Sequence, residues 1–288
     1  MNGLKTYGDS PTKPCWDKLV TIRNLRVGLI QFEVTDSKTE NLQRVIRSLE
    51  AVGRDCDLVV FPEYSMGYSK GALSRDFVED LAEPLNAEFV ESVAEKSKEK
   101  QIVVVLPIFE KDDSSVFNTA VIIDRGKVKG GYRKIHLFDA LGYRESEFFR
   151  PGSELVLFDV GGMTFGVVTC YDVRFPELIK KEVMSGATAI IVPAAWFRGP
   201  LKEEQWQTLL MARAAETTSY VIGVGNANEN FVGRSLVVDP FGVKVLDLGY
   251  GDRIGRCEID NNLITNAREK IPVLQQSRNL PDIQCRRL

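Results

Sequence analysis

Three short stretches contain side chains that could do covalent chemistry. Glu63 follows an apolar run and a proline in FPEYSMG, and Lys134 lies in YRKIHLFD. Cys170 lies in GVVTCYDVRFPEL, between a β-rich run and a segment with helical spacing. A partly desolvated carboxylate can act as a base, an ammonium can stabilise an oxyanion, and a thiolate is a nucleophile. A turn after the strand would expose Cys170 and direct the Tyr171 amide toward an oxyanion formed there.

Taken singly, each of these side chains also has an ordinary structural explanation. Glu63 is compatible with a solvated acid at a turn, and Lys134 with a solvated surface charge beside an arginine. An isolated cysteine such as Cys170 is more often buried and inert, which is our interpretation of Cys56 and Cys257. Chemistry is therefore indicated only by the combination of the three stretches.

His136 is the only histidine in the chain. A Ser–His–Asp or Cys–His–Asn hydrolase would have to use it, and a multi-histidine metal site is excluded. We interpret His136 as structural, because no second histidine or serine motif accompanies it. The five cysteines are widely spaced without a CxxC pair, which argues against a zinc ribbon or a dithiol redox motif. These features favour a reducing cytoplasm.

Length and composition indicate a globular α/β protein. The chain has 288 residues, 44% of them hydrophobic, and a formal net charge of -3. This charge gives no reason to expect nucleic acid or an acidic membrane surface, and no apolar run is long enough to span a membrane. We expect an N-terminal arm over residues 1–24 without a secretory signal, one domain over 25–282, and a C-terminal tail over 283–288.

Apolar runs and amphipathic segments alternate along the chain. The pattern predicts strands at residues 25–32, 58–61, 102–109, 188–192 and 220–224. It predicts helices at residues 36–52, 86–100, 175–185 and 203–217. Turn signals predict hairpins at residues 116–132, 155–169 and 235–248, whereas residues 135–153 are typical of a loop. This mixture predicts a layered α/β domain with a mixed sheet or two sheets.

Together, the glutamate after a strand, the lysine in K-I-H-L-F and the cysteine in C-Y-D-x-R-F-P-E resemble the nitrilase superfamily of carbon–nitrogen hydrolases. The resemblance extends from about residue 26 to about residue 282. It implies a Glu63–Lys134–Cys170 triad, with Glu145 as a fourth catalytic group and Glu147 as the nearby alternative. It also implies a four-layer α-β-β-α sandwich.

The resemblance implies acyl transfer through a thioester, without metal or cofactor. Glu63 would take the proton of Cys170, and Lys134 and the Tyr171 amide would hold the oxyanion. Ammonia would leave, and water activated by Glu63 or Glu145 would release the acid. Substrate contacts are expected from Tyr64, Asn118, Arg174, Ala195 and Trp196. Members usually form homodimers or larger homo-oligomers, here through the helices that follow Cys170 and contain Trp206.

The C-terminal half resembles the amidase branch, in particular omega-amidases and deaminated-glutathione amidases. The segments that carry this resemblance are QWQTLLMARAAE, SLVVDPFG and REKIPVLQQSR. They imply a small aliphatic amide, acidic at its other end. Two loops depart from the branch, one around Arg234 in place of a histidine and one at residues 194–206. Both are expected to line the pocket. Arg174 or Arg198 could meet a substrate carboxylate, although we favour an ion pair between Arg174 and Glu177.

Other functions remain open at this stage. An N-carbamoyl-amino-acid or β-ureido hydrolase of the same superfamily would release carbon dioxide as well as ammonia. A true nitrilase is disfavoured, because C-W-E is expected where this chain has C-Y-D. A non-catalytic scaffold of the same fold is disfavoured by the complete triad. A redox-sensing role of Cys170 is disfavoured because no resolving cysteine lies close in sequence.

Overall fold

Two six-stranded sheets form the middle of the molecule in the computed structural model, which describes residues 24–69, 71–278 and 286–287. The strand order of the first sheet is β14-β1-β2-β3-β4-β5. Its strands are β1 (Leu25–Gln31), β2 (Leu58–Val60), β3 (Val103–Asp112), β4 (Ser115–Asp124), β5 (Lys127–Arg133) and β14 (Arg253–Ile259). The strand order of the second sheet is β13-β12-β11-β10-β9-β8. Its strands are β8 (Leu157–Val160), β9 (Met163–Val167), β10 (Ala189–Ala194), β11 (Tyr220–Gly225), β12 (Leu236–Val238) and β13 (Lys244–Asp247).

Each sheet has a parallel centre with antiparallel strands at its edges. Strands β1, β2 and β3 are parallel neighbours, as are β9, β10 and β11. The hairpins β4–β5, β8–β9 and β12–β13 are antiparallel, as the turn signals predicted. Every residue of β10 and β11 is buried, which explains their continuous apolar sequences, because both faces of a central parallel strand are covered.

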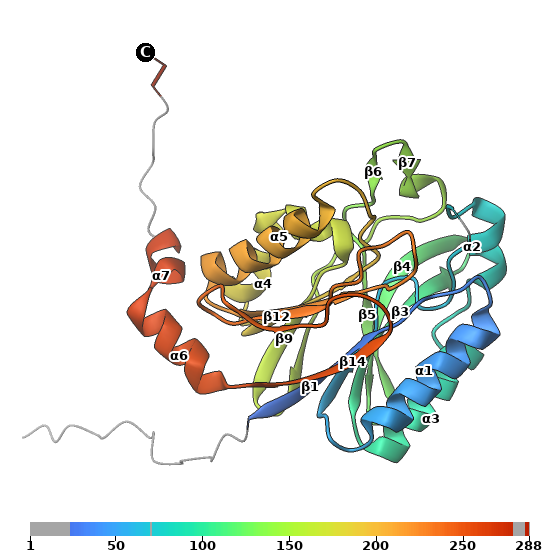
Figure 1. Cartoon of the computed structure of the whole chain (residues 1–288), viewed down its shortest axis with the longest axis horizontal. Coiled ribbons are helices and arrows are strands. Elements are labelled where there is room, and N and C mark those ends of the chain that lie inside the picture. The colour runs from blue at the N-terminus through green and yellow to red at the C-terminus, as the bar shows by residue number, and fades with distance from the viewer. Residues whose placement is uncertain (1–23, 70, 279–285, 288) are drawn as a thin grey trace, which may run out of the picture.

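Helices cover the outer faces of both sheets (Figure 1). Helices α1 (Lys38–Val52), α2 (Arg75–Leu81) and α3 (Glu88–Lys100) accompany the first sheet, and α4 (Pro176–Met184) and α5 (Lys202–Thr217) accompany the second. One hydrophobic cluster lies between α1, α3 and the first sheet, a second between the two sheets, and a third beneath α4 and α5. This arrangement confirms the expected α-β-β-α sandwich.

Local sequence signals account for the ends of α1. Ser37 has an extended backbone, and its hydroxyl accepts a hydrogen bond from the Glu40 amide, as an N-cap residue does. Gly53 ends the helix with φ 62°, a value that suits glycine. Val45 and Leu49 lie on the apolar stripe that the spacing predicted, and both are completely buried. That stripe fixes α1 against the first sheet.

Several elements were not predicted from the sequence. They are β14, α2, the helices α6 (Asn261–Lys270) and α7 (Val273–Arg278), and the short strands β6 (Asp139–Ala140) and β7 (Tyr143–Arg144). Strand β14 pairs with β1 in antiparallel register and completes the first sheet. Residues 1–23 of the expected N-terminal arm, and residues 283–285 and 288 of the expected tail, lie outside the described residues, so both boundaries stay predictions.

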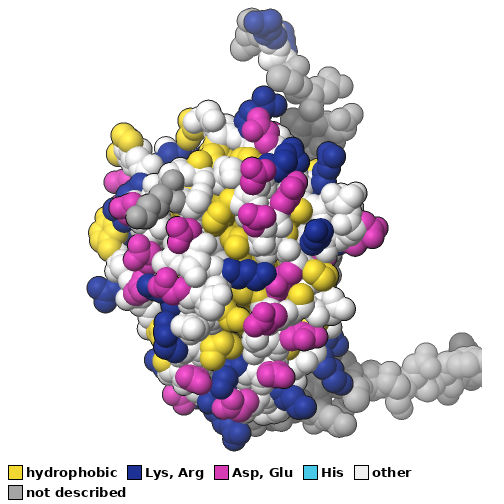
Figure 2. Space-filling view, turned by 90° about the vertical axis from the view of Figure 1, so that its right-hand side faces the viewer, with side chains coloured by type: hydrophobic (Ala, Val, Ile, Leu, Met, Phe, Trp, Pro, Cys, Tyr) yellow, Lys and Arg dark blue, Asp and Glu magenta, His cyan; other side chains and the backbone are white. Residues whose placement is uncertain are grey.

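The surface of the described residues offers no long apolar helix. No helix within these ranges has the length and hydropathy to cross a membrane. The face at the right of Figure 1 is shown in Figure 2, where acidic and basic side chains are interspersed. This face therefore lacks the continuous basic patch that binds a nucleic acid backbone.

Candidate active site

The residues expected to react come from different strands but lie at neighbouring strand ends. Glu63 follows β2, Lys134 follows β5, and Cys170 follows β9. Ala195 follows β10, and Glu145 begins the short 3-10 helix Glu145–Glu147 in the segment that the sequence indicated as a loop. Strands β2 and β5 belong to the first sheet and β9 and β10 to the second, so groups far apart in sequence converge where strand ends of the two sheets meet.

Glu63 is held from both of its carboxylate oxygens and is almost completely buried. Its Oε1 accepts from Lys134 Nζ at 2.9 Å and from Asn118 Nδ2 at 2.8 Å. Its Oε2 accepts from the Ala195 backbone amide at 2.7 Å. Burial raises the pKa of Glu63; Lys134 opposes this effect, and the Glu145 carboxylate adds to it. A buried base with a raised pKa is suited to proton transfer near neutral pH.

Lys134 lies between two glutamates. Its Nζ is 2.9 Å from Glu63 Oε1 and 2.8 Å from Glu145 Oε2. Burial lowers the pKa of Lys134, but the Glu145 and Glu63 carboxylates outweigh this and hold the pKa well above its ordinary value. The ammonium therefore stays charged. Glu145 also accepts from the Tyr64 hydroxyl, from the Phe138 amide, and from Asn118.

Cys170 occupies a sharp turn. Its φ is 49°, a left-handed value that an L-residue with a side chain rarely adopts, and such strain is concentrated at functional sites. It opens the 3-10 helix Cys170–Arg174, so the Tyr171 amide lies in a first helical turn, where N–H groups lack intrahelical partners. Burial raises the pKa of the Cys170 thiol, Glu63 raises it further, and Lys134 lowers it. The resting group is therefore a thiol.

Asp172 ties the cysteine turn to the lysine segment. Its Oδ2 accepts from the Thr169 amide at 3.1 Å and from the Tyr132 hydroxyl at 2.8 Å. Its Oδ1 accepts from the His136 amide at 2.8 Å, and the His136 ring nitrogen Nδ1 is 3.0 Å away. The His136 ring also stacks on Phe175 at 3.5 Å. These contacts agree with a structural role for the histidine.

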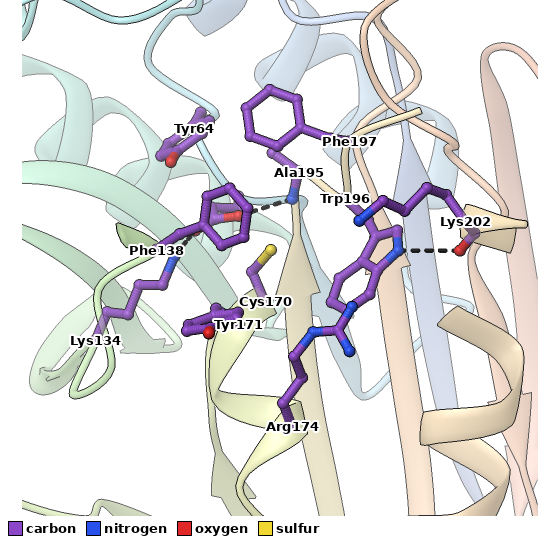
Figure 3. Close-up of a pocket in the computed structure, with 11 residues that line it drawn as sticks. Tyr64, Lys134, Phe138, Cys170, Tyr171, Arg174, Ala195, Trp196, Phe197 and Lys202 are labelled. Atoms are coloured by element: carbon purple, nitrogen blue, oxygen red, sulfur yellow. Dashed lines mark hydrogen bonds and ion pairs between the residues drawn. The ribbon is translucent and has the colours of Figure 1, made fainter. Parts of the chain in front are cut away.

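A pocket with about 360 Å³ of space lies beside the reactive residues (Figure 3). Glu63, Lys134 and Cys170 form its reactive part. The other lining residues are Tyr64, Phe138, Tyr171, Arg174, Ala195, Trp196, Phe197 and Lys202. Aromatic side chains therefore dominate the wall, which favours a ligand with a short aliphatic part and restricts water. Among the described residues, no cluster of His, Cys, Asp and Glu is arranged to hold a metal ion.

The structure separates the expected substrate contacts into two groups. Tyr64, Arg174, Ala195 and Trp196 line the pocket. Asn118 does not: it lies behind the wall, where its amide nitrogen donates to both glutamates. Its placement is that of a positioning residue.

Three details of the sequence interpretation need correction. Arg174 donates to the Gln205 side chain at 3.1 Å and, among the ion pairs of the described ranges, has none with Glu177. Arg198 lies outside the pocket and donates to the Phe231 carbonyl. Arg234 also lies outside the pocket lining. It forms ion pairs with Glu203 and Asp247, because these carboxylates flank it on α5 and β13. Of the two loops that were expected to line the pocket, only the one at residues 194–206 does so.

Phe138, Phe197 and Lys202 also line the pocket but were not identified from the sequence. Phe138 lies in the same motif as Lys134, which was a usable signal. Phe197 and Lys202 follow Trp196 in the sequence, within the segment 194–206 that was already expected to line the pocket. Lys202 carried no signal of its own, because a lysine at the start of an amphipathic helix is ordinarily solvated.

The model of the carbon–nitrogen hydrolase family matches residues 26–269. The chain belongs to this family. This chain is 34% identical to the deaminated glutathione amidase of Escherichia coli O157:H7, over 87% of its own length and 96% of the relative. It is 31% identical to the 2-oxoglutaramate amidase of Bacillus subtilis, over 88% of this chain and 97% of the relative. The chain is therefore an enzyme that hydrolyses an amide carbon–nitrogen bond.

Solved structures agree with this assignment. This chain superposes on Nit3 of Saccharomyces cerevisiae, a member of the nitrilase superfamily, with a TM-score of 0.78 at 30% identity. The superposition covers 88% of this chain and 97% of that one. It superposes on the Caenorhabditis elegans NitFhit protein with a TM-score of 0.79 at 30% identity, covering 88% of this chain and 64% of that one. The expectation of a nitrilase-superfamily hydrolase is confirmed.

Proposed function

We propose that this enzyme hydrolyses a small aliphatic amide to a carboxylate and ammonia through a thioester on Cys170. The observation that carries the proposal is that Lys134 Nζ lies within 2.9 Å of Glu63 and 2.8 Å of Glu145, in the pocket that Cys170 lines. One base, one fixed cation and one nucleophile are thus assembled without a histidine.

The first half-reaction forms the thioester. Glu63 takes the proton from the Cys170 sulfur, which attacks the amide carbonyl carbon. The Lys134 ammonium and the Tyr171 backbone amide hold the oxyanion. When the oxyanion collapses, the carbon–nitrogen bond breaks, Glu63 returns the proton to the leaving nitrogen, and ammonia departs. The raised pKa of Glu63 suits both proton transfers.

The second half-reaction releases the acid. Water attacks the thioester while Glu63 or Glu145 takes its proton, and the proton returns to the Cys170 sulfur as the carbon–sulfur bond breaks. The Ala195 amide holds the Glu63 carboxylate at 2.7 Å, so Glu63 has the same position in both half-reactions.

The substrate that this pocket supports best is an omega-amide with an acidic group at its other end. The relatives named deaminated glutathione amidase, 2-oxoglutaramate amidase and omega-amidase support this choice. Arg174 supplies a pocket cation that can meet a carboxylate. We also propose that the enzyme is cytoplasmic and forms a homodimer through α4 and α5.

The test is a panel of omega-amides, N-carbamoyl amino acids and nitriles, with ammonia as the readout. We expect omega-amides to be hydrolysed and Cys170→Ala to lose at least 1,000-fold in rate, roughly the loss for a missing nucleophile. Cys257→Ala is the matched control and should be unaffected, because Cys257 lies on β14.

The mass spectrum of the enzyme with a slow substrate should show the acyl group on Cys170. Wild-type activity in Cys170→Ala would overturn the proposal. Equal release of ammonia and carbon dioxide from a carbamoyl substrate, with no activity on amides, would favour the N-carbamoyl hydrolase instead.

A further inference from the structure

Two cations lie together at one wall of the pocket. Figure 3 shows Arg174 and Lys202 beside Trp196, on the side away from Lys134 and Tyr64. The Arg174 guanidinium carbon is 4.7 Å from the centroid of the Trp196 ring, and Lys202 Nζ is 6.0 Å from it. The Trp196 indole nitrogen donates to the Lys202 carbonyl at 3.0 Å, so the ring and the lysine backbone are held together.

Among the residues that the structure describes, no carboxylate neutralises either cation. Within the described ranges, no ion pair to a carboxylate is formed by Arg174 or by Lys202. Within the described part of the chain, the side-chain hydrogen bond of Arg174 is to the neutral Gln205 amide oxygen, at 3.1 Å. The acidic residues of the catalytic group, Glu63 and Glu145, are already paired with Lys134. The Trp196 wall therefore has two positive charges that nothing in this part of the chain balances.

Local stability does not explain the position of Lys202. It is the first residue of α5, where the helix dipole disfavours a cation, and the preceding Leu201 provides no side-chain cap. Burial lowers the pKa of Lys202, and the nearby Arg174 lowers it further. A lysine placed against its own helix dipole and beside another cation costs stability, which is typical of a functional position.

From this arrangement we propose that Arg174 and Lys202 form a two-cation site that selects amides whose acyl part has two anionic groups. The proposal rests on the proposed function and names the substrate class more narrowly. A single carboxylate would leave one positive charge unbalanced next to the aromatic wall. Two carboxylates on neighbouring carbons would neutralise both cations, and Trp196 would pack on the aliphatic carbons between them.

Three amides with the same five-carbon backbone separate the possibilities. Valeramide is neutral, glutaramate has one carboxylate, and the terminal monoamide of propane-1,2,3-tricarboxylic acid has two. We expect kcat/KM to rise in that order. In Lys202→Gln, kcat/KM for the dianionic amide should fall about 10-fold or more through KM, since a charge-assisted contact is lost. The loss on valeramide should be smaller, because that amide has no carboxylate for Lys202 to meet.

Lys127→Gln is the matched control, because Lys127 is an exposed lysine in the β4–β5 hairpin and its substitution makes the same change in net charge. Arg174→Gln should lower kcat/KM for both glutaramate and the dianionic amide. Raising the salt concentration should raise KM for the dianionic amide most, because screening weakens contacts between partly exposed charges.

A direct binding measurement separates this proposal from the proposed function. Calorimetry with propane-1,2,3-tricarboxylate as the probe should show binding to wild type and at least 10-fold weaker binding to Lys202→Gln. Activity on valeramide and glutaramate with no preference for the dianionic amide, and no calorimetric difference, would overturn the two-cation site alone. Calorimetric binding with no ammonia from any amide would overturn the proposed function alone.

Discussion

Glu145 is the residue whose contribution to the chemistry can be isolated most sharply. It accepts from four donors: Lys134, Tyr64, Asn118 and the Phe138 amide. In Glu145→Gln one carboxylate oxygen becomes an NH₂ donor that faces other donors, so Lys134 loses a charged partner. We expect kcat to fall about 100-fold or more with little change in KM, because Glu145 is not in the pocket lining.

The control for this prediction is Glu147→Gln. Glu147 lies two residues away but has a half-exposed side chain, 3.5 Å from Arg144. Steady-state kinetics of Glu145→Gln and Glu147→Gln on the same amide show which of the two glutamates contributes to turnover. Equal losses of kcat in both variants, or a loss confined to Glu147→Gln, would show that Glu145 is not the fourth catalytic carboxylate.

The pH dependence of turnover follows from the protonation states of Glu63 and Cys170. The reactive form has an ionised Glu63 and a protonated Cys170. Burial raises the pKa of Glu63, so its proton is retained to a higher pH than usual, and activity should be lost as pH falls through that raised value. Burial also raises the pKa of Cys170, so the thiol form persists into alkaline solution.

We therefore expect a kcat/KM profile whose acid midpoint lies above the ordinary glutamate value of about 4.3. The two groups interact, so the midpoints belong to the assembly and not to either residue. The measurement is kcat/KM from pH 4 to 10, with enzyme from each pH re-assayed at neutral pH to exclude denaturation. Full activity at pH 4 would contradict Glu63 as the base.

Short sequence motifs predicted residues that the structure brings together, but they did not predict the whole pocket. Glu63, Lys134, Cys170 and Glu145 were identified because each lies in a short motif whose order along the chain is distinctive. Lys202 was missed because its role depends on where the chain brings Trp196 and Arg174. Side-chain direction after a loop is decided by tertiary contacts, which a single sequence does not encode locally.

At the scale of elements, the contact between α4 and β9 contains an unusual acid. Glu182 on α4 is completely buried, and its Oε1 accepts from the Val167 amide at 3.1 Å. Its Oε2 lacks a partner among the described residues. Burial raises the pKa of Glu182 well above its ordinary value. The carboxyl therefore keeps its proton to a higher pH than an ordinary glutamate does, and it must ionise without a compensating cation once the pH exceeds its raised pKa.

This acid should make the enzyme less stable in alkali. A folded-state pKa above the unfolded one gives stability that is complete below the unfolded pKa and is lost as pH rises through the folded value. Glu182→Gln keeps an acceptor for Val167 and cannot ionise, so its Tm should fall less than that of wild type as the pH rises from 5 to 9.5. Calorimetric melts of both proteins across this range test the prediction, and parallel declines would refute it.

Elements were predicted from sequence where local pattern decided them. The helix stripes of α1 and the hairpin turn at Gly126 were recovered because they depend on neighbouring residues. Strand β14 was missed because RIGRCEI contains charged residues on its exposed positions, and only pairing with β1 makes it a strand. Pairing between segments that lie at opposite ends of the chain has no local signal.

At the scale of the whole molecule, the layered architecture leaves α4 and α5 on an outer face (Figure 1). Thr208 lies exposed near the middle of α5, so an arginine there would place a charge in the proposed dimer contact. We expect Thr208→Arg to change the species seen by light scattering from dimer to monomer at micromolar concentration. Burying an unpaired charge at an interface costs several kcal/mol, roughly enough for that change.

Dissociation should also affect catalysis, because α5 begins at Lys202 in the pocket and Gln205 on the same helix holds Arg174. Loss of a packed partner would loosen that first turn, so KM for an anionic amide should rise while the valeramide rate changes little. Ser114→Arg, in the exposed turn between β3 and β4, is the control for the added charge. A wild-type monomer would contradict the proposed dimer. An unchanged KM in a monomeric Thr208→Arg would show that α5 positions its pocket residues without the partner.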